Sequence, residues 1–371
     1  MLNHVTQKLR VHQYHDCVQP HDAVTNQMRF LKTVLRDAGI SGEIFSRHIK
    51  PQGWSEAQPF HANRVWDCDL LLIHHSQGSP LLSEVLKIEV PKALVYHNIT
   101  PSYFFNHDPY LRDLCQLGRA QLLQMRPQLI AAFADSKFNA TELEELGYSS
   151  PQLLPLFDLG ACQITTRKPR TPRHLIFVGK ITPHKNQALL IKTLFYLNLL
   201  WEKKAKLTLV GGEDPIYGRY VRHLVKALGL ETVVTFTGKI DDEALREHFR
   251  LADAFLSTSL HEGYGVPLVE AMRAGLPVFA LSNSAVPETV KGAGVLLETQ
   301  KPHHIANIIA TVLADPKAVA LIQQSQKKRL QELEKEQSRQ KVLEPLVPLV
   351  RSLRKIPSPA THSERTLDAS P

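Results

Sequence analysis

Two glutamates separated by seven residues bracket a glycine-rich stretch in the C-terminal half of the chain. Glu262 and Glu270 lie in STSLHEGYGVPLVEAMRAG, residues 257–275, which reads as a strand end, a loop and the start of a helix. Pro267 suits the first turn of that helix, because its missing N–H would be unpaired there anyway. Such a helix start attracts a phosphate through its exposed N–H groups. A diphosphate repels carboxylates, so we expect the glutamates to bind hydroxyl groups.

These residues belong to a chain in which short apolar strands alternate with amphipathic helices, the pattern of α/β domains with parallel sheets. A length of 371 residues suits two domains better than one. Residues 161–172 are basic and proline-bearing, and read as a linker. We expect an N-terminal domain over residues 1–160, a C-terminal domain over residues 173–355 whose last helix could pack back on the first domain, and a disordered tail over residues 356–371.

Both domains are expected to be doubly wound and Rossmann-like, with the carboxyl ends of their strands facing one cleft. In the first domain, a strand at Leu9–Tyr14 leads into a loop from Asp16 to Asp22, and Asp22 suits the N-cap of a helix at Ala23–Ala38. Further strands are predicted at Leu70–His74, Ala93–His97, Ile130–Ala134, His174–Val178, Leu207–Val210, Val233–Thr237, Ala254–Thr258 and Val278–Leu281.

The segment HEGYGVPLVEAMRAGLPV, residues 261–278, resembles glycosyltransferase family 4, whose E-x7-E motif it carries. The resemblance covers roughly residues 16–295. It implies the GT-B architecture and the transfer of a sugar, with retained anomeric configuration, from a nucleotide-sugar donor to an acceptor. In the usual proposal for this family the leaving phosphate takes the acceptor proton, and positioning and electrostatics carry the catalysis. No protein nucleophile, no metal and no other cofactor is then expected.

A second matching segment is FVGKITPHKN, residues 177–186. In this family the corresponding strand end carries a basic pair that binds the donor β-phosphate, and Lys180 and Lys185 occupy those positions here. Preorganised cations at this point stabilise the charge that develops on the departing nucleoside diphosphate. The family usually has arginine at the first position, whereas Lys180 supplies charge without the bidentate fork of arginine.

The N-terminal domain carries two further resemblances. LVYHNITP, residues 94–101, resembles the YHNITP signature of a polysaccharide-type branch, and we expect His97 to reach the cleft and hydrogen-bond the donor sugar. HDAVTN, residues 21–26, matches the family's first loop, commonly GDAVSN, with His21 in place of glycine. That loop borders the phosphates and the acceptor, so Asp22 and Asn26 are acceptor-side candidates. Asp22 could equally serve only as an N-cap.

The resemblance therefore implies a site with a catalytic and a donor-binding part. The catalytic candidates are His97, Lys180, Lys185 and Glu262. The turn at residues 238–240 resembles the one whose backbone meets the nucleotide base. The donor-binding candidates are accordingly Gly179, Gly263, Tyr264, Gly265, Val266, Glu270, Gly238, Lys239 and Ile240.

Two further motifs in the sequence could suggest a metal site. Asp67 and Asp69 form a D-x-D sequence, but they precede a strand instead of ending one, which favours a structural role. His74 and His75 would point to opposite faces of a strand, so a shared metal is not expected. Two alternatives stay open: a non-catalytic GT-B subunit that binds a partner or glycan, and a GT-B phosphorylase or sugar-nucleotide epimerase.

The amino-acid composition indicates which classes of binding partner and which compartment to expect. The formal charge is +8, from 44 Lys and Arg against 36 Asp and Glu, which favours anionic partners. The charge alone does not separate a nucleotide-phosphate site from a membrane face or from a generally basic surface. It would permit a lipid-linked acceptor at a membrane, and no nucleic acid is expected. Four scattered cysteines suit a reducing compartment, and no apolar run reaches the roughly 18 residues needed to span a bilayer. We therefore expect a cytoplasmic protein, with peripheral contact at the inner membrane face allowed.

Overall fold

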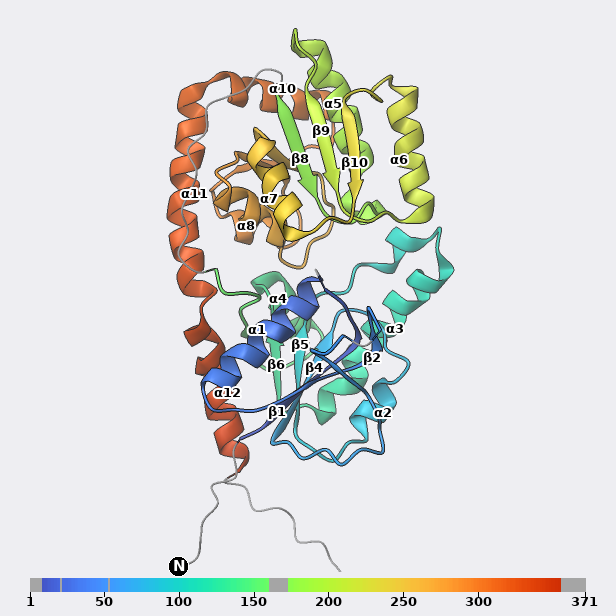
Figure 1. The fold of residues 1–371 in the computed structure, drawn as a ribbon, viewed down its shortest axis with the longest axis vertical. Helices are drawn as coiled ribbons and strands as arrows, with labels where there is room; N and C mark the ends of the chain where they lie inside the picture. Colours follow the sequence, from blue (N-terminus) through green and yellow to red (C-terminus); the bar gives the residue numbers. More distant parts are fainter. Residues whose placement is uncertain (1–8, 21, 53, 160–172, 355–371) are drawn as a thin grey trace, which may run out of the picture.

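The computed structural model describes residues 9–20, 22–52, 54–159 and 173–354, and the predicted linker and tail lie outside these ranges. It contains two parallel sheets, one in each of two α/β domains that lie end to end (Figure 1). The two-domain α/β architecture predicted from the sequence is thereby confirmed. In each sheet the first strand of the domain lies inside and the chain winds outward on both sides of it, which is the doubly wound arrangement.

The N-terminal sheet has seven strands in the order β3-β2-β1-β4-β5-β6-β7. Its strands are β1 (Val11–Val18), β2 (Ile44–Ile49), β3 (Gln58–Pro59), β4 (Leu70–His75), β5 (Lys92–Tyr96), β6 (Ala131–Ala134) and β7 (Gln152–Leu153). The helical segments of this domain are α1 (Ala23–Asp37), α2 (Leu82–Leu86), η1 (Ser102–Phe105), α3 (Pro109–Met125), η2 (Arg126–Gln128) and α4 (Lys137–Glu145).

The C-terminal sheet has six strands in the order β10-β9-β8-β11-β12-β13. Its strands are β8 (His174–Val178), β9 (Lys206–Val210), β10 (Val234–Gly238), β11 (Ala254–Ser257), β12 (Val278–Leu281) and β13 (Val295–Leu297). Its helical segments are η3 (Pro183–Lys185), α5 (Gln187–Leu200), α6 (Pro215–Ala227), α7 (Asp242–Leu251), α8 (Val266–Arg273), α9 (Val286–Val290), α10 (Pro302–Ala314), α11 (Pro316–Glu336) and α12 (Arg339–Leu353).

Both sheets are covered by helices on both faces, and alternate strand residues therefore enter different cores. On β4, Leu71 and Ile73 join one buried cluster, whereas Leu70 and Leu72 join another on the opposite face. The second cluster also contains Val342, Leu346 and Val350 of α12. The last helix thus completes the core of the first domain, while α11 packs on the second.

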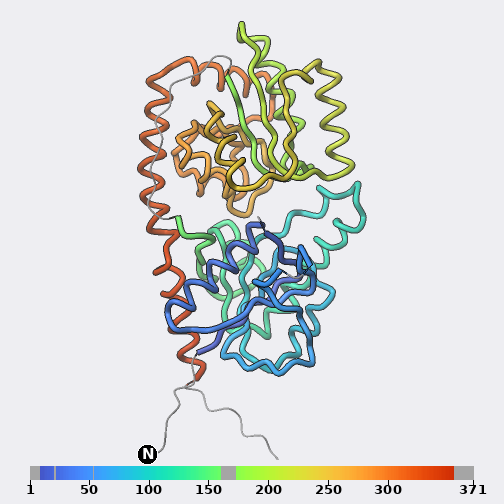
Figure 2. The backbone as a smooth tube through the Cα atoms, viewed as in Figure 1, coloured from blue at the N-terminus to red at the C-terminus, as the bar shows by residue number. Residues whose placement is uncertain are grey.

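The chain crosses between the domains twice, and the two crossings are tied together. The first crossing contains Leu156 and Leu159, and the second is Gln337, at the end of α11. The Gln337 side-chain oxygen accepts a hydrogen bond from Leu156 N at 2.8 Å, and its carbonyl accepts one from Leu159 N at 3.4 Å. Figure 2 shows the long C-terminal helices running alongside both domains. The carboxyl ends of the two sheets face each other across the boundary between the domains, because Ser136, which follows β6, donates to the carbonyl of Gly263, which follows β11.

One expectation about β1 was wrong. The predicted loop from Asp16 begins too early, because β1 continues to Val18. Asp16 is buried there and its carboxylate accepts a hydrogen bond from the Ser79 hydroxyl at 2.7 Å, so a polar residue is accommodated in the strand by a partner distant in sequence. Among the described residues no single helix is long and apolar enough to cross a membrane, and only α10 together with the helices after it, bent by 93°, reaches that length and composition.

Candidate active site

Lys185 and Glu262 meet at the carboxyl end of the C-terminal sheet. Lys185 ends η3, after β8, and Glu262 lies in the loop after β11, the neighbouring strand. Lys185 Nζ lies 2.6 Å from Glu262 Oε1, and the two side chains are only 18% and 15% exposed. The two loops are also joined by their backbones, since Leu260 N donates to His184 O at 2.7 Å. Two of the predicted catalytic residues therefore form one partly buried ion pair.

Lys180 is arranged differently from Lys185. It is exposed, and its carbonyl accepts a hydrogen bond from the Gln187 side chain at 3.0 Å, which fixes the backbone after β8. The preceding residue, Gly179, lies against Gly211 at the end of β9, where an added Cβ would come within 2.3 Å of Gly179 O. Glycine at 211 therefore permits the close approach of the two strand ends. The Lys180 ammonium is left facing solvent at the predicted phosphate position.

The glycine loop, residues 258–265 between β11 and α8, lies directly against the N-terminal domain. A Cβ added to Gly263 would come within 2.9 Å of Asn98 Cβ and 3.0 Å of His97 O, so a side chain at this position would force the domains apart. Gly265 has a φ of 86° and caps the start of α8, with Val266 as the first helical residue. Tyr264 lies between these glycines, and burial raises the pKa of its hydroxyl.

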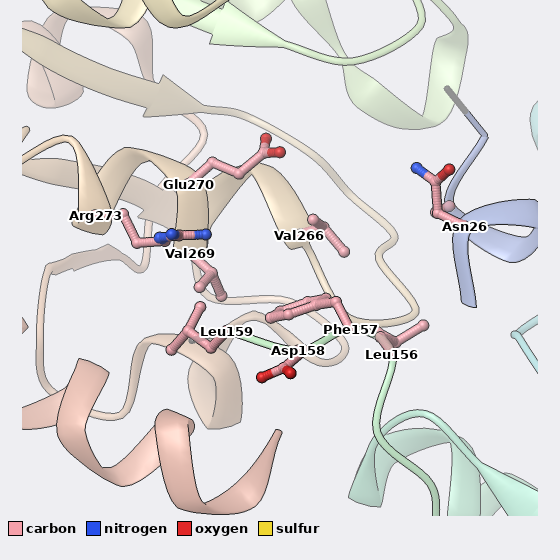
Figure 3. Close-up of a pocket in the computed structure, with 10 residues that line it drawn as sticks. Asn26, Leu156, Phe157, Asp158, Leu159, Val266, Val269, Glu270 and Arg273 are labelled. Carbon is pink, nitrogen blue, oxygen red and sulfur yellow. The ribbon is translucent and has the colours of Figure 1, made fainter. Parts of the chain in front are cut away.

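Glu270 points into a cavity of about 190 Å³ between the domains (Figure 3). The cavity brings together three predicted residues, Glu270 and Val266 from α8 and Asn26 from α1. Burial, with a smaller contribution from Asp242, raises the pKa of Glu270 to about 7, although Arg273 acts in the opposite direction. The full lining is Ala23, Asn26, Leu156, Phe157, Asp158, Leu159, Val266, Val269, Glu270 and Arg273.

The remaining sequence-predicted residues lie apart from the ion pair. Gly238 ends β10 with a φ of 67°, and its carbonyl accepts from Gly211 N at 3.0 Å. Lys239 is exposed beside Gly212, while Ile240 packs on a buried cluster. Asp22 caps α1, because its carboxylate accepts hydrogen bonds from Thr25 N and Thr25 Oγ1, both at 2.9 Å. His21 lies outside the described residues.

The sequence led us to expect the His97 ring in the cleft, but the structure places the ring inside the N-terminal domain. The side chain is 2% exposed, with Nδ1 at 2.8 Å from Asp135 Oδ2 and Nε2 at 2.8 Å from His74 Nδ1. Its position after β5 brings the backbone to the cleft, and the His97 carbonyl does face Gly263. The ring, however, turns back into the domain, so neither nitrogen is available to a donor sugar in this arrangement.

Sequence reasoning missed a polar contact between the domains beside this histidine. Asn98 has a φ of 74°, and its side-chain oxygen bonds to His261 Nε2 across the domain boundary. The Asn98 amide nitrogen donates to Asn139 Oδ1 at 2.9 Å. Burial is the main cause that lowers the pKa of His261 to about 4. Asn98 belongs to residues 94–101, the segment that resembles the YHNITP signature. Its position just after a predicted strand could have indicated that it lies at the domain boundary.

The start of α4 also binds the C-terminal domain. The Ser136 hydroxyl donates to Gly263 O at 2.7 Å, and Lys137 N and Phe138 N each donate to the Glu288 carboxylate at 3.0 Å. A carboxylate at a helix N-terminus is stabilised by the unpaired N–H groups and by the helix dipole. The glycine loop is therefore held from the N-terminal side by Ser136.

The two sequence motifs that could suggest a metal have structural partners. Asp67 pairs with Arg10 at 2.7 Å, and Asp69 pairs with Arg354 at 2.7 Å. His75 bonds to Gly118 O on one face of the sheet, while His74 bonds to His97 on the other. Within the part of the chain that the structure describes, no group of three His, Cys, Asp or Glu side chains could hold a metal ion.

Solved structures resemble almost the whole chain. Sucrose-phosphate synthase from Thermosynechococcus elongatus is 18% identical with a TM-score of 0.70, and the alignment covers 94% of this chain and 100% of that one. Anabaena HepE in complex with UDP-glucose is 17% identical with a TM-score of 0.71, covering 93% and 100%. The chain has the GT-B fold. At these identities the likeness establishes the architecture alone.

Sequence comparisons match less than half of this GT-B chain. Residues 164–329 match the family described as Glycosyl transferases group 1. O-antigen chain mannosyltransferase B of Escherichia coli is 26% identical over 194 residues, or 45% of this chain and 49% of that protein. A GDP-mannose-dependent alpha-(1-6)-phosphatidylinositol monomannoside mannosyltransferase of Mycobacterium tuberculosis is 30% identical over 157 residues, 40% of each. The chain thus spans less than half the length of these relatives.

Proposed function

We propose that this GT-B protein is a glycosyltransferase that moves a sugar from a nucleotide-sugar donor to a glycan or lipid-linked acceptor. The observation that carries the proposal is the ion pair between Lys185 and Glu262, formed at the ends of neighbouring strands beside the glycine loop. The match of residues 164–329 to Glycosyl transferases group 1 supports it, because that stretch contains both members of the pair.

The site offers separate groups for the three parts of a nucleotide-sugar. In our proposal Lys185 and the exposed Lys180 bind the diphosphate, where positive charge stabilises the leaving group. Glu262 accepts hydrogen bonds from sugar hydroxyls, and Glu270, one turn into α8, accepts them from the ribose. The cavity beside Glu270 gives the nucleoside a partly apolar wall through Phe157 and Val266.

The proposed reaction retains the anomeric configuration and uses no metal. The bond from the acceptor oxygen to C1 forms on the face from which the phosphate oxygen departs, and the acceptor proton passes to that phosphate oxygen. The E-x7-E spacing of Glu262 and Glu270 supports this assignment by resemblance to family 4. Lysine side chains would neutralise the diphosphate in place of a divalent cation. The anomeric proton coupling of the product, measured by NMR, tests retention directly.

Net charge and the names of two relatives support the proposed acceptor classes. One relative is named for an O-antigen chain and another for a phosphatidylinositol mannoside, so glycan and lipid-linked acceptors are both proposed. The net charge of +8 favours approach to an anionic membrane surface. We propose a cytoplasmic protein that works at the inner face of the membrane.

A thermal-shift screen tests the donor site and identifies the base. UDP, GDP, ADP and their hexose derivatives are added to the wild type and to Glu270→Ala, each with and without EDTA. We expect one nucleotide to raise the melting temperature of the wild type, with no effect of EDTA and a weaker shift in Glu270→Ala. Stabilisation that vanishes with EDTA would contradict metal independence, and no stabilisation by any nucleotide would contradict the donor site.

A further inference from the structure

A continuous chain of buried hydrogen bonds runs across the top of the N-terminal sheet. The Gln13 amide nitrogen donates to Met28 O at 2.9 Å, and its oxygen lies 2.9 Å from His74 Nε2. His74 Nδ1 then lies 2.8 Å from His97 Nε2, and His97 Nδ1 lies 2.8 Å from Asp135 Oδ2. Each of these side chains is buried, so the protein must satisfy every polar atom internally.

This series of hydrogen bonds fixes how many protons His74 and His97 hold. Because Gln13 uses its nitrogen on Met28 O, its oxygen faces His74, and His74 Nε2 must carry a proton. Asp135 is an acceptor, so His97 Nδ1 carries a second. The contact between His74 Nδ1 and His97 Nε2 needs a third proton between two nitrogens. Three protons on two imidazole rings give the pair one positive charge.

The surroundings place that charge on His97. Burial, followed by the proximity of His97 and His15, holds the pKa of His74 well below its usual range, so His74 is the neutral ring. Asp135 provides the compensating negative charge, and its other oxygen accepts from the Gln27 side chain at 3.0 Å. Among the neighbouring histidines, His15 on β1 lies near enough to lower the pKa of His74, whereas His75 on β4 points to the opposite face of the sheet and bonds to Gly118 O.

We propose that His74 and Asp135 are positioning residues that hold His97 as a buried imidazolium, and that this ion pair fixes the end of β6 against the glycine loop. The link to the site is Ser136, the residue after Asp135, whose hydroxyl donates to Gly263 O at 2.7 Å. The His97 carbonyl faces the same glycine. The effect on catalysis rests on the proposed glycosyl transfer, whereas the protonation state does not.

Nitrogen NMR of the full chain labelled with ¹⁵N-histidine tests the protonation state directly. From the hydrogen-bond chain we expect His97 to show two protonated nitrogens and His74 to show a proton on Nε2 alone. The signals are assigned by their loss in His97→Gln and His74→Asn. A neutral His97 ring in the wild type, or a proton on His74 Nδ1, would overturn the proposal without bearing on glycosyl transfer.

Substitutions at position 74 test the positioning role. His74→Asn keeps an acceptor for His97 Nε2, so we expect a doubly protonated His97 and a transfer rate within about threefold of the wild type. His74→Leu removes the acceptor, and we expect His97 to lose a proton and the rate to fall about tenfold or more. His75→Asn, a buried neighbour on the opposite face, is the control and should leave the His97 signals unchanged. Equal rates and equal His97 spectra in the Leu and Asn variants would refute the role.

Discussion

Lys185 Nζ lies 2.6 Å from Glu262 Oε1, although the two residues are 77 positions apart and reach each other from loops after different strands. In this arrangement each charge is satisfied by the other. A diphosphate that binds Lys185 must share its ammonium with Glu262, so the carboxylate orients the lysine while it remains able to accept from a sugar hydroxyl. In the proposed reaction the pair would therefore couple recognition of the phosphate to recognition of the sugar.

Lys185→Ala should reduce the transfer rate by about 100-fold or more. The variant removes a preorganised cation from the leaving group, an effect comparable to ~2.7–4 kcal/mol for the loss of an oxyanion donor. Steady-state kinetics with saturating donor measures it. Lys204→Ala, an exposed lysine after α5, is the matched control and should retain the wild-type rate. A loss below about threefold for Lys185→Ala would remove this residue from the mechanism.

Glu262→Gln should keep the shape of the loop and lose the charge-assisted hydrogen bond to the sugar. A hydrogen bond to a charged group contributes about 1.5–3 kcal/mol, so we expect the transfer rate to fall by about 10- to 100-fold. Binding of the free nucleoside diphosphate, measured by calorimetry, should change much less, because that ligand has no sugar to recognise. Equal losses in both measurements would show that Glu262 acts only through Lys185.

Glu270 should make stability and nucleotide binding depend on pH in opposite directions. Because burial raises its pKa to about 7, the folded protein keeps a proton that the unfolded chain releases near its ordinary value of 4.5. Stability from this group is therefore present below about pH 4.5 and is lost as the pH rises toward 7. Thermal melts over this range should show a weaker decline in Glu270→Gln than in the wild type.

Nucleotide affinity should instead rise through neutral pH, because the ionised Glu270 is the better acceptor for ribose hydroxyls. Calorimetry at about pH 6 and pH 8 measures the difference, and binding should release protons. A wild type and a Glu270→Gln variant with identical pH profiles would contradict both the raised pKa and the ribose contact.

Glu288→Ala should loosen the contact between the domains. Its carboxylate accepts from Lys137 N and Phe138 N at the start of α4, a role similar to an N-cap, and caps contribute about 1 kcal/mol. We expect the melting temperature to fall by about 2–4 °C. Glu344→Ala, an exposed glutamate paired with Lys341, is the control and should melt within about 1 °C of the wild type. A Glu288→Ala protein as stable as this control would rule out the capping role.

The fold and the position of the main motifs could be predicted because they depend on local patterns. Period-two and continuous apolar runs located β4, β5 and β8 closely, and Asp22 and Pro267 act at their helix starts as residue chemistry dictates. The short strands β3, β7 and β13 were not predicted, because two or three residues are too few to show a periodic pattern.

The orientation of His97 and the contacts between domains could not be predicted from the sequence. A strand-end position indicates where a backbone stops, but the ring of His97 turned inward because Asp135 and His74 offered partners there. Asn98 with His261, and Ser136 with Gly263, are more than 100 positions apart, and no local pattern encodes such pairs. The predicted donor residues stay predictions until a donor is bound.

The most direct test of glycosyl transfer is the release of nucleoside diphosphate from UDP-, GDP- and ADP-hexoses, measured by ion-exchange chromatography with EDTA present. The wild type, Lys185→Ala and Glu262→Gln are compared, with and without lipid-linked and glycan acceptors. We predict that one donor yields its diphosphate with a glycosylated acceptor, and that both variants are impaired. Sugar phosphate, an isomerised donor, or no turnover of any donor despite nucleotide binding would contradict the account.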